Sequence, residues 1–261
     1  MTRCIILAAG QGSRLRPLTD NKPKALVPLL GKPLLERQIS TLNAVGIEKI
    51  AIATGYQSDK IKQLGYPTYH NPDFATTNMV ESLFAAREFF EHSNEDLVIS
   101  YGDIVYQKNN IQTLLTTQGN LAVMVDTGWL SLWSARNENP LNDAETLKFN
   151  THGDIIEIGK KPKTLDDING QYTGLIRISR EKIHELIKLY DTLDRSKSYD
   201  SKSFKQMYMT SFLQTLIDLG WHVRPAYVKH GWLEVDTVAD LTLYEALSQN
   251  GKLSNLWSPD K

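Results

Sequence analysis

A short glycine-containing segment near the N-terminus carries the residue types that bind phosphate. LAAGQGSRLRPLT (7–19) follows the apolar run CIILAA (4–9) and contains Gly10, Gly12 and Arg14. Two glycines permit unusual φ angles and a close backbone approach, and successive backbone N–H groups in such a loop can surround phosphate oxygens. Arg14 would add a planar, bidentate donor. A tight turn without a ligand is the alternative that this segment leaves open.

The spacing of this segment separates it from two common nucleotide-binding loops. It lacks the Gly-Lys-Ser/Thr ending of a P-loop, and Gly10-x-Gly12-x-x-Leu15 lacks the third glycine of a dinucleotide fingerprint. NKPKAL (21–26), a few residues later, presents Lys24 next to the rigid Pro23. Arg14 and Lys24 together could bracket a triphosphate.

Two aspartates are candidates for binding a divalent cation. Asp103 follows an apolar run in SYGDIV, and Asp236 follows an apolar and aromatic run in HGWLEVDT. Mg²⁺ prefers one or two carboxylates together with substrate phosphates and water. Asp236 also precedes TVADLTLYEAL (237–247), so the alternative is that it caps this helix, as Thr237 could also do.

The elements that must position these residues alternate between strand-like and helix-like segments. This alternation predicts an α/β fold with a mostly parallel sheet and helices on its faces. Ligands of such sheets bind outside the carboxyl ends of the strands, where Gly10, Asp103 and Asp126 follow their apolar runs. Strands are expected at 4–9, 49–54, 96–105, 121–126, 147–150, 154–159, 172–179 and 222–228. Helices are expected at 32–46, 58–64 (capped by Ser58), 78–90, 180–193, 203–219 and 237–247.

The organisation of the chain favours one domain over residues 1–261, with an inserted subregion at 127–170 where the alternating pattern loosens. The chain carries 29 Lys+Arg against 30 Asp+Glu, so it has no basic excess for a nucleic-acid backbone. It has no apolar run of about 18 residues and no signal-peptide pattern, so we expect a cytoplasmic protein that binds no membrane. The single Cys4 reads as a buried apolar filler of the first strand. The oligomeric state stays open, and a homo-oligomer is compatible with the sequence.

The segment LAAGxGxRLxPLTxxxPKALxPxxGKPLLE at 7–36 resembles the signature of the sugar-nucleotidyltransferase superfamily. These enzymes join a nucleoside triphosphate to a phosphorylated acceptor and release pyrophosphate, on a Rossmann-like single domain. The resemblance implies that Arg14 and Lys24 are catalytic contacts to the phosphates, and that Asp103 and Asp236 are the ligands of Mg²⁺. The nucleotide site that it implies consists of Leu7, Ala8, Ala9, Gly10, Gly12, Ser13, Arg14, Lys24, Asn78, Ser82 and Asp103.

The segment TNMVESL (77–83) decides which branch of the superfamily the chain resembles. It departs from the Gln and Pro-Gly motif of hexose-phosphate enzymes and is similar to TNN-x-x-SL of the cytidylyltransferases that activate phosphocholine or 2-aminoethylphosphonate. The resemblance therefore implies CTP as the nucleotide, with Asn78 and Ser82 near its base or ribose. Helix capping is the alternative for Asn78.

The inserted subregion also resembles this branch. VDTGWLSLWSARNENPLNDAETLKF (125–149) is similar to VDxxWxxxWxxR followed by DAE, and 155–179 is similar to the IGKK and GQYxGL elements. The acceptor site thereby implied consists of Asp126, Trp129, Trp133, Glu145, Lys160, Lys161, Tyr172 and Glu234. Aromatic faces and carboxylates suit an amine or quaternary ammonium, although tryptophans at this spacing can equally pack in a core and a lysine pair is often solvated.

These observations predict a CTP- and Mg²⁺-dependent cytidylyltransferase that transfers CMP to a small phosphorylated acceptor bearing an amine. The named acceptors are phosphocholine, 2-aminoethylphosphonate and the phosphoglutamine used in modifying capsule polysaccharide. The acceptor phosphate is already anionic, so the reaction needs no general base, and the six histidines show no catalytic spacing. The alternatives are a hexose-1-phosphate nucleotidyltransferase using UTP or dTTP, a non-catalytic nucleotide-binding regulatory module, and a glycosyltransferase.

Overall fold

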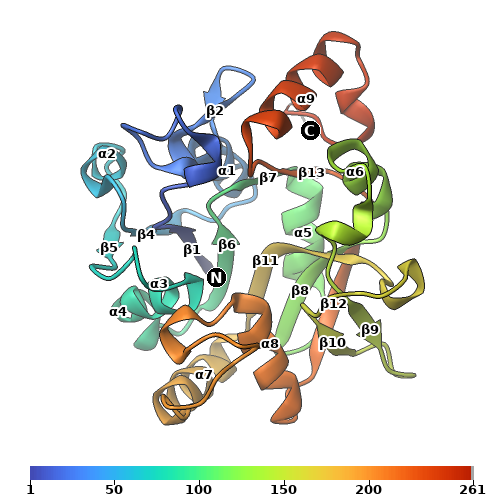
Figure 1. Cartoon of the computed structure of the whole chain (residues 1–261). Coiled ribbons are helices and arrows are strands. Elements are labelled where there is room, and N and C mark those ends of the chain that lie inside the picture. Colours follow the sequence, from blue (N-terminus) through green and yellow to red (C-terminus); the bar gives the residue numbers. More distant parts are fainter. Residues whose placement is uncertain (260–261) are drawn as a thin grey trace.

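A computed structural model describes residues 1–259, and within this range nine strands form one mixed sheet (Figure 1). Strands β11 and β10 run antiparallel to their neighbours, and the other pairs in the sheet are parallel. The expected α/β fold is thus confirmed. The strand order is β5 (Thr68–His70), β4 (Lys49–Thr54), β1 (Thr2–Ala8), β6 (Asp96–Tyr101), β11 (Gln171–Ile178), β8 (Leu121–Asp126), β12 (Val223–Val228), β10 (Ile155–Ile158) and β9 (Leu147–Phe149).

Helices pack on both faces of this sheet, and the alternation of side chains along β1 creates the two cores. Cys4 and Ile6 belong to one buried cluster, and Ile5 and Leu7 belong to the other. Cys4 is therefore the buried filler that the sequence predicted. The first cluster includes side chains from α1 (Leu34–Ala44), α2 (Ser58–Lys62), α5 (Lys108–Thr116), α6 (Trp129–Arg136) and α9 (Val238–Gln249). The second includes side chains from α3 (Met79–Ala85), α4 (Arg87–Glu91), α7 (Arg180–Thr192) and α8 (Met209–Asp218).

Several expected elements differ from the structure at their ends. The helix expected at 78–90 is divided at Ala86 into α3 and α4, and the helix expected at 203–219 begins with a 3₁₀ turn, Phe204–Gln206, before α8. The prediction that Ser58 caps α2 is wrong, because Ser58 is its first helical residue and Gln57 precedes it with a φ of 51°.

The strand expected at 96–105 is divided in the structure, because β6 ends at Tyr101 and a second short strand begins at Ile104. This division determines where Asp103 lies. After β6, Gly102 turns the chain, and β7 (Ile104–Tyr106) pairs with β13 (Trp232–Glu234) in a separate two-stranded ribbon. Strand β1 lies between β4 and β6, so the crevice beyond the carboxyl ends of β1 and β6 is where ligands of open α/β sheets bind. Within residues 1–259, no helix combines the length and apolar character needed to cross a bilayer.

Candidate active site

A cavity of about 310 Å³ opens beyond the carboxyl ends of β1 and β6. Each of the residues predicted to bind the nucleotide lines it, as does Asp236. The sequence analysis did not assign the remaining lining residues to the site, although several lie next to residues that it did assign: Ala25, Phe74, Thr77, Met79, Tyr101 and Gly102.

The glycine loop brings Lys24 into this cavity. Gly12 has a φ of 73°, a left-handed conformation that side-chain-bearing residues rarely adopt. Its carbonyl accepts hydrogen bonds from the backbone N–H of Leu15 and the hydroxyl of Thr19, each at 2.9 Å. A Cβ atom at position 12 would lie 2.8 Å from Cβ of Lys24. Glycine is therefore needed here for the turn and for the packing of Lys24.

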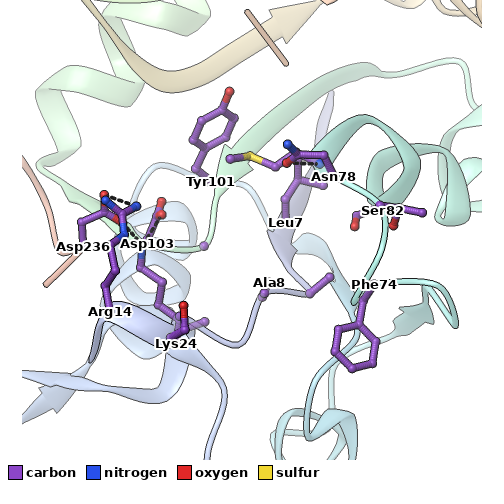
Figure 2. Close-up of a pocket in the computed structure, with 18 residues that line it drawn as sticks. Leu7, Ala8, Arg14, Lys24, Phe74, Asn78, Ser82, Tyr101, Asp103 and Asp236 are labelled. Atoms are coloured by element: carbon purple, nitrogen blue, oxygen red, sulfur yellow. Dashed lines mark hydrogen bonds and ion pairs between the residues drawn. The ribbon is translucent and has the colours of Figure 1, made fainter. Parts of the chain in front are cut away.

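A charged cluster occupies one end of the cavity (Figure 2). The ammonium of Lys24 lies 2.7 Å from Oδ2 of Asp103 and 2.5 Å from Oδ1 of Asp236. Arg14 pairs with Oδ2 of Asp236 at 2.7 Å. Burial lowers the pKa of Lys24, but the carboxylates of Asp103, Asp236 and Glu234 outweigh it, so the pKa is raised overall and Lys24 stays charged.

The ribbon of β7 and β13 explains why two aspartates distant in sequence meet. Glu234 pairs with Ile104, and the backbone N–H of Val235 donates to the carbonyl of Asp103 at 3.0 Å. These contacts hold the residues after β13 beside those after β6. The side chains of Asp103 and Asp236 therefore point toward the same ammonium group (Figure 2).

The cap of α9 leaves the carboxylate of Asp236 available to the cavity. Thr237 is the capping residue, and its hydroxyl accepts a hydrogen bond from the backbone N–H of Asp240. The carboxylate of Asp240 accepts from the backbone N–H groups of Asp236 and Thr237, and Arg136 holds both Asp240 and Glu234 at 2.9 Å. The alternative that Asp236 caps α9 is therefore wrong.

Three carboxylates at this end have the composition of a divalent-cation site. One oxygen from each of Asp103, Glu234 and Asp236 lies within 4.8 Å of the others. Oδ1 of Asp103 is buried, and no hydrogen-bond partner reaches it from the described residues. Burial raises the pKa of Glu234, although Arg136 opposes this. Hard oxygen donors suit Mg²⁺, so the donor set fits this ion.

The opposite end of the cavity is uncharged and holds Phe74, Asn78 and Ser82 (Figure 2). Asn78 is the N-cap of α3, and its side chain accepts from the backbone N–H of Met79 at 2.8 Å. The hydroxyl of Ser82 accepts a hydrogen bond from the side-chain amide of Asn71. Asn78 therefore caps a helix and lines the cavity at the same time, so the two readings of this residue coexist.

A second cavity, of about 200 Å³, shares Met79 and Tyr101 with the first. Four of the residues predicted to bind the acceptor line it, namely Trp133, Glu145, Tyr172 and Glu234. Burial, followed by repulsion from Asp143 and Asp200, raises the pKa of Glu145 to about 7. The residues that sequence reasoning missed here include Asp143, Gln171, Thr173, Tyr208 and Thr210.

Two other predicted acceptor residues, Asp126 and Trp129, are buried structural residues outside this lining. The carboxylate of Asp126 accepts from the backbone N–H groups of Gly128 and His230 and from the indole of Trp232, at 2.8 to 2.9 Å. The ring of Trp129 packs edge-on against Trp133 in the core, with centroids 6.0 Å apart. The structure therefore gives both side chains a structural role and does not bring them to this cavity.

The lysine pair expected to hold the acceptor phosphate also lies outside the lining. Lys160 pairs with Glu157 at 3.3 Å. Lys161 donates to the carbonyls of Leu141 and Asn142 at 2.6 and 2.7 Å. Both lysines therefore lie on the surface of the inserted subregion, and their role toward the acceptor phosphate stays a prediction.

Comparison with known proteins decides the family. The model of the MobA-like NTP transferase domain matches residues 4–145, more than half of the chain. This chain belongs to that family. It is a nucleotidyltransferase, as the motif at 7–36 predicted, and the matched range contains the glycine loop, Lys24 and Asp103.

One relative extends the similarity over nearly the whole chain. The CTP:phosphoglutamine cytidylyltransferase of Campylobacter jejuni is 43% identical over 245 residues, which cover 91% of this chain and 96% of that protein. Among solved structures, the CTP:phosphocholine cytidylyltransferase of Streptococcus pneumoniae (TM-score 0.67, 22% identity) covers 96% of this chain and 99% of its own. The inositol-1-phosphate CTP transferase of T. maritima (TM-score 0.72, 22% identity) covers 98% of this chain and 97% of its own. These structural likenesses show the fold.

Proposed function

We propose that this protein is a CTP-dependent cytidylyltransferase that transfers CMP to a small phosphorylated acceptor bearing an amine, with phosphoglutamine as the leading acceptor. The observation that carries the proposal is the pair of cavities that share Met79 and Tyr101. The acidic cluster is divided between them, with Asp103 and Asp236 in the first and Glu234 in the second. The similarity to a phosphoglutamine enzyme over 91% of the chain supports the choice of substrates.

The residues of the first cavity have separate roles in this proposal. The uncharged end near Asn78 and Ser82 receives the cytosine and ribose, and Arg14 and Lys24 contact the triphosphate. Asp103 and Asp236 would hold Mg²⁺, which neutralises phosphate charge when bound. An oxygen of the acceptor phosphate forms the new bond to the α-phosphorus, and the bond to the β-phosphate oxygen breaks to release diphosphate.

The second cavity receives the rest of the acceptor, along Trp133, Tyr172 and Glu145. Residues 127–170 contribute Trp133, Asp143 and Glu145, so we assign them to an acceptor-binding subregion of a single domain. A CDP-activated product of this kind suits later transfer of the acceptor phosphate to a cell-surface polysaccharide such as a capsule.

The proposal is tested by diphosphate release with Mg²⁺ and each of CTP, UTP, ATP, GTP and dTTP. Each nucleotide is paired with phosphoglutamine, phosphocholine, 2-aminoethylphosphonate and glucose 1-phosphate. We expect turnover only with CTP and an amine-bearing acceptor. Turnover of glucose 1-phosphate with UTP or dTTP would instead establish a hexose-1-phosphate enzyme, and CTP binding without any turnover would favour a regulatory module.

A further inference from the structure

We infer that the second cavity selects acceptors carrying a primary ammonium group over those carrying a quaternary one, with Glu145 as the residue that makes this distinction. The inference rests on the proposed cytidylyltransferase function and specifies the acceptor that it takes. It depends on how Glu145 is held, on the charge of the cavity and on which oxygen atoms of the cavity can still accept a hydrogen bond.

Glu145 is fixed by its backbone while its carboxylate stays unpaired. The side chain of Gln171 accepts from the backbone N–H of Glu145 at 3.1 Å and donates to its carbonyl at 2.6 Å. Gln171 is itself buried at the start of β11. Within residues 1–259, no hydrogen bond or ion pair reaches the carboxylate oxygens of Glu145. The carboxylate is therefore positioned in the cavity wall without a counter-ion.

The side chains that line the second cavity give it a negative charge, which favours a cationic ligand. Asp143, Glu145 and Glu234 line it, and no Lys, Arg or His belongs to the lining among the described residues. The guanidinium of Arg136 forms an ion pair with the carboxylate of Glu234 at 2.9 Å and neutralises it. Asp143 lies 3.9 Å from the same guanidinium. Glu145 is thus the carboxylate of this wall that is left for a ligand, and leaving a half-buried carboxylate without a partner costs free energy.

A primary and a quaternary ammonium differ in their capacity to donate hydrogen bonds. A primary ammonium carries three N–H donors, whereas a quaternary one carries none and relies on aromatic faces. The hydroxyl of Tyr172 is buried in the same wall, next to the hydroxyl of Tyr101, and its oxygen has two lone pairs, so it can accept a further hydrogen bond. A primary ammonium would satisfy both Glu145 and Tyr172. A trimethylated nitrogen would neutralise the charge but donate to neither oxygen, so the carboxylate of Glu145 would stay without a hydrogen bond.

The tests use phosphoethanolamine and phosphocholine, which differ only in the three methyl groups on nitrogen. With CTP and Mg²⁺, we expect kcat/KM to be at least about tenfold higher for phosphoethanolamine, since a site built for hydrogen bonds rejects an analogue that lacks them. In Glu145→Gln, KM for phosphoethanolamine should rise about tenfold or more with kcat changed much less, and the preference should disappear. The matched control is Glu245→Gln, an exposed glutamate on α9, which should behave as the wild type.

Two further variants guard against an effect on folding. Glu145→Asp keeps the charge and should restore part of the preference, and Tyr172→Phe removes one hydroxyl and should weaken it. Equal or faster turnover of phosphocholine by the wild type would overturn the inference while leaving the cytidylyltransferase function intact. So would an unchanged preference in Glu145→Gln. If no acceptor turns over with CTP, the proposed function fails, and calorimetric binding of the same two compounds then decides the inference alone.

Discussion

The ammonium of Lys24 lies 2.7 Å from the carboxylate of Asp103, a residue 79 positions away in the sequence. Both side chains are largely buried, and the same ammonium contacts Asp236. In the free protein, Lys24 therefore provides the positive charge that offsets the acidic cluster. When phosphates and a cation enter, the same lysine can instead contact the phosphates.

The first prediction concerns Lys24→Met. Removing the ammonium leaves Asp236 paired with Arg14 and takes away the ion-pair partner of Asp103, so the free protein should lose about 1–3 kcal/mol of stability. Turnover should fall at least about 100-fold, because charge stabilisation of the phosphates is lost. Thermal unfolding with and without Mg²⁺ checks the first part, since Mg²⁺ should stabilise the variant more than the wild type. Equal stability of the two proteins without Mg²⁺ would contradict the role in the free state.

The second prediction concerns the carboxylates themselves. Asp103→Asn and Asp236→Asn should each reduce diphosphate release by at least about 100-fold, because each removes one anionic oxygen ligand while keeping the shape of the side chain. Circular dichroism should show an unchanged fold. The matched control is Asp166→Asn, an exposed aspartate of the inserted subregion, which should retain full activity. Near-normal turnover in both cluster variants would refute the metal assignment.

The third prediction compares two glycines of the same loop. A Cβ at Gly12 would meet the side chain of Lys24 at 2.8 Å and would sit on a backbone with a φ of 73°, whereas a Cβ at Gly10 meets nothing within 4 Å. Gly12→Ala should therefore lower the free energy of unfolding by about 1–3 kcal/mol, from strain and crowding together. Gly10→Ala should leave it nearly unchanged. Chemical denaturation of both variants measures the difference, and similar losses in the two would count against the packing argument.

The nucleotide cavity could be predicted from the sequence because most of its residues lie in a few short, continuous segments. The apolar run at 4–9, the glycine loop that follows it and Lys24 lie close together in the sequence. This segment by itself predicts a phosphate site at the carboxyl end of the first strand. Tyr101 was missed because the sequence places it inside the apolar strand expected at 96–105, although it lines both cavities. The residues that flank Tyr101 in the sequence do not indicate that its side chain separates the two cavities.

The acceptor cavity was harder to predict, because a carboxylate that follows a strand can either bind a ligand or hold neighbouring backbone in place. Asp126 follows a strand just as Asp103 does, but the chain near His230 and Trp232 returns beside it and uses its carboxylate for backbone and indole hydrogen bonds. The return of a segment about 100 residues later is a tertiary event that no local spacing reveals. Likewise, the sequence could not show that Lys161 would bond to carbonyls of its own subregion.

The fourth prediction is the pH dependence of acceptor binding at Glu145. Burial, with Asp143 and Asp200 nearby, raises the pKa of Glu145 to about 7 in the free protein, so the group is neutral below this pH and a carboxylate above it. The hydroxyls of Tyr101 and Tyr172 also face this site, but burial raises their pKa values, so they stay neutral in this range. Because an ammonium pairs with the carboxylate, KM for phosphoethanolamine should fall as the pH rises from about 6 to 8. Phosphate groups titrate near pH 6 as well, so the profile of Glu145→Gln supplies the reference to subtract.

The same shift predicts an effect on stability with the opposite sign from that of most carboxylates. A raised pKa means that the folded state binds the proton more tightly than the unfolded state, so stability is lost as the pH rises from the ordinary value of 4.5 toward about 7. Glu145→Gln escapes this loss and should be more stable than the wild type at pH 8, by up to about 3 kcal/mol, but not at pH 4.5. Urea denaturation at the two pH values measures it. A wild type that keeps its full stability relative to Glu145→Gln at pH 8 would show that the carboxylate already has a partner, and the acceptor's ammonium would then have no vacant counter-ion to bind.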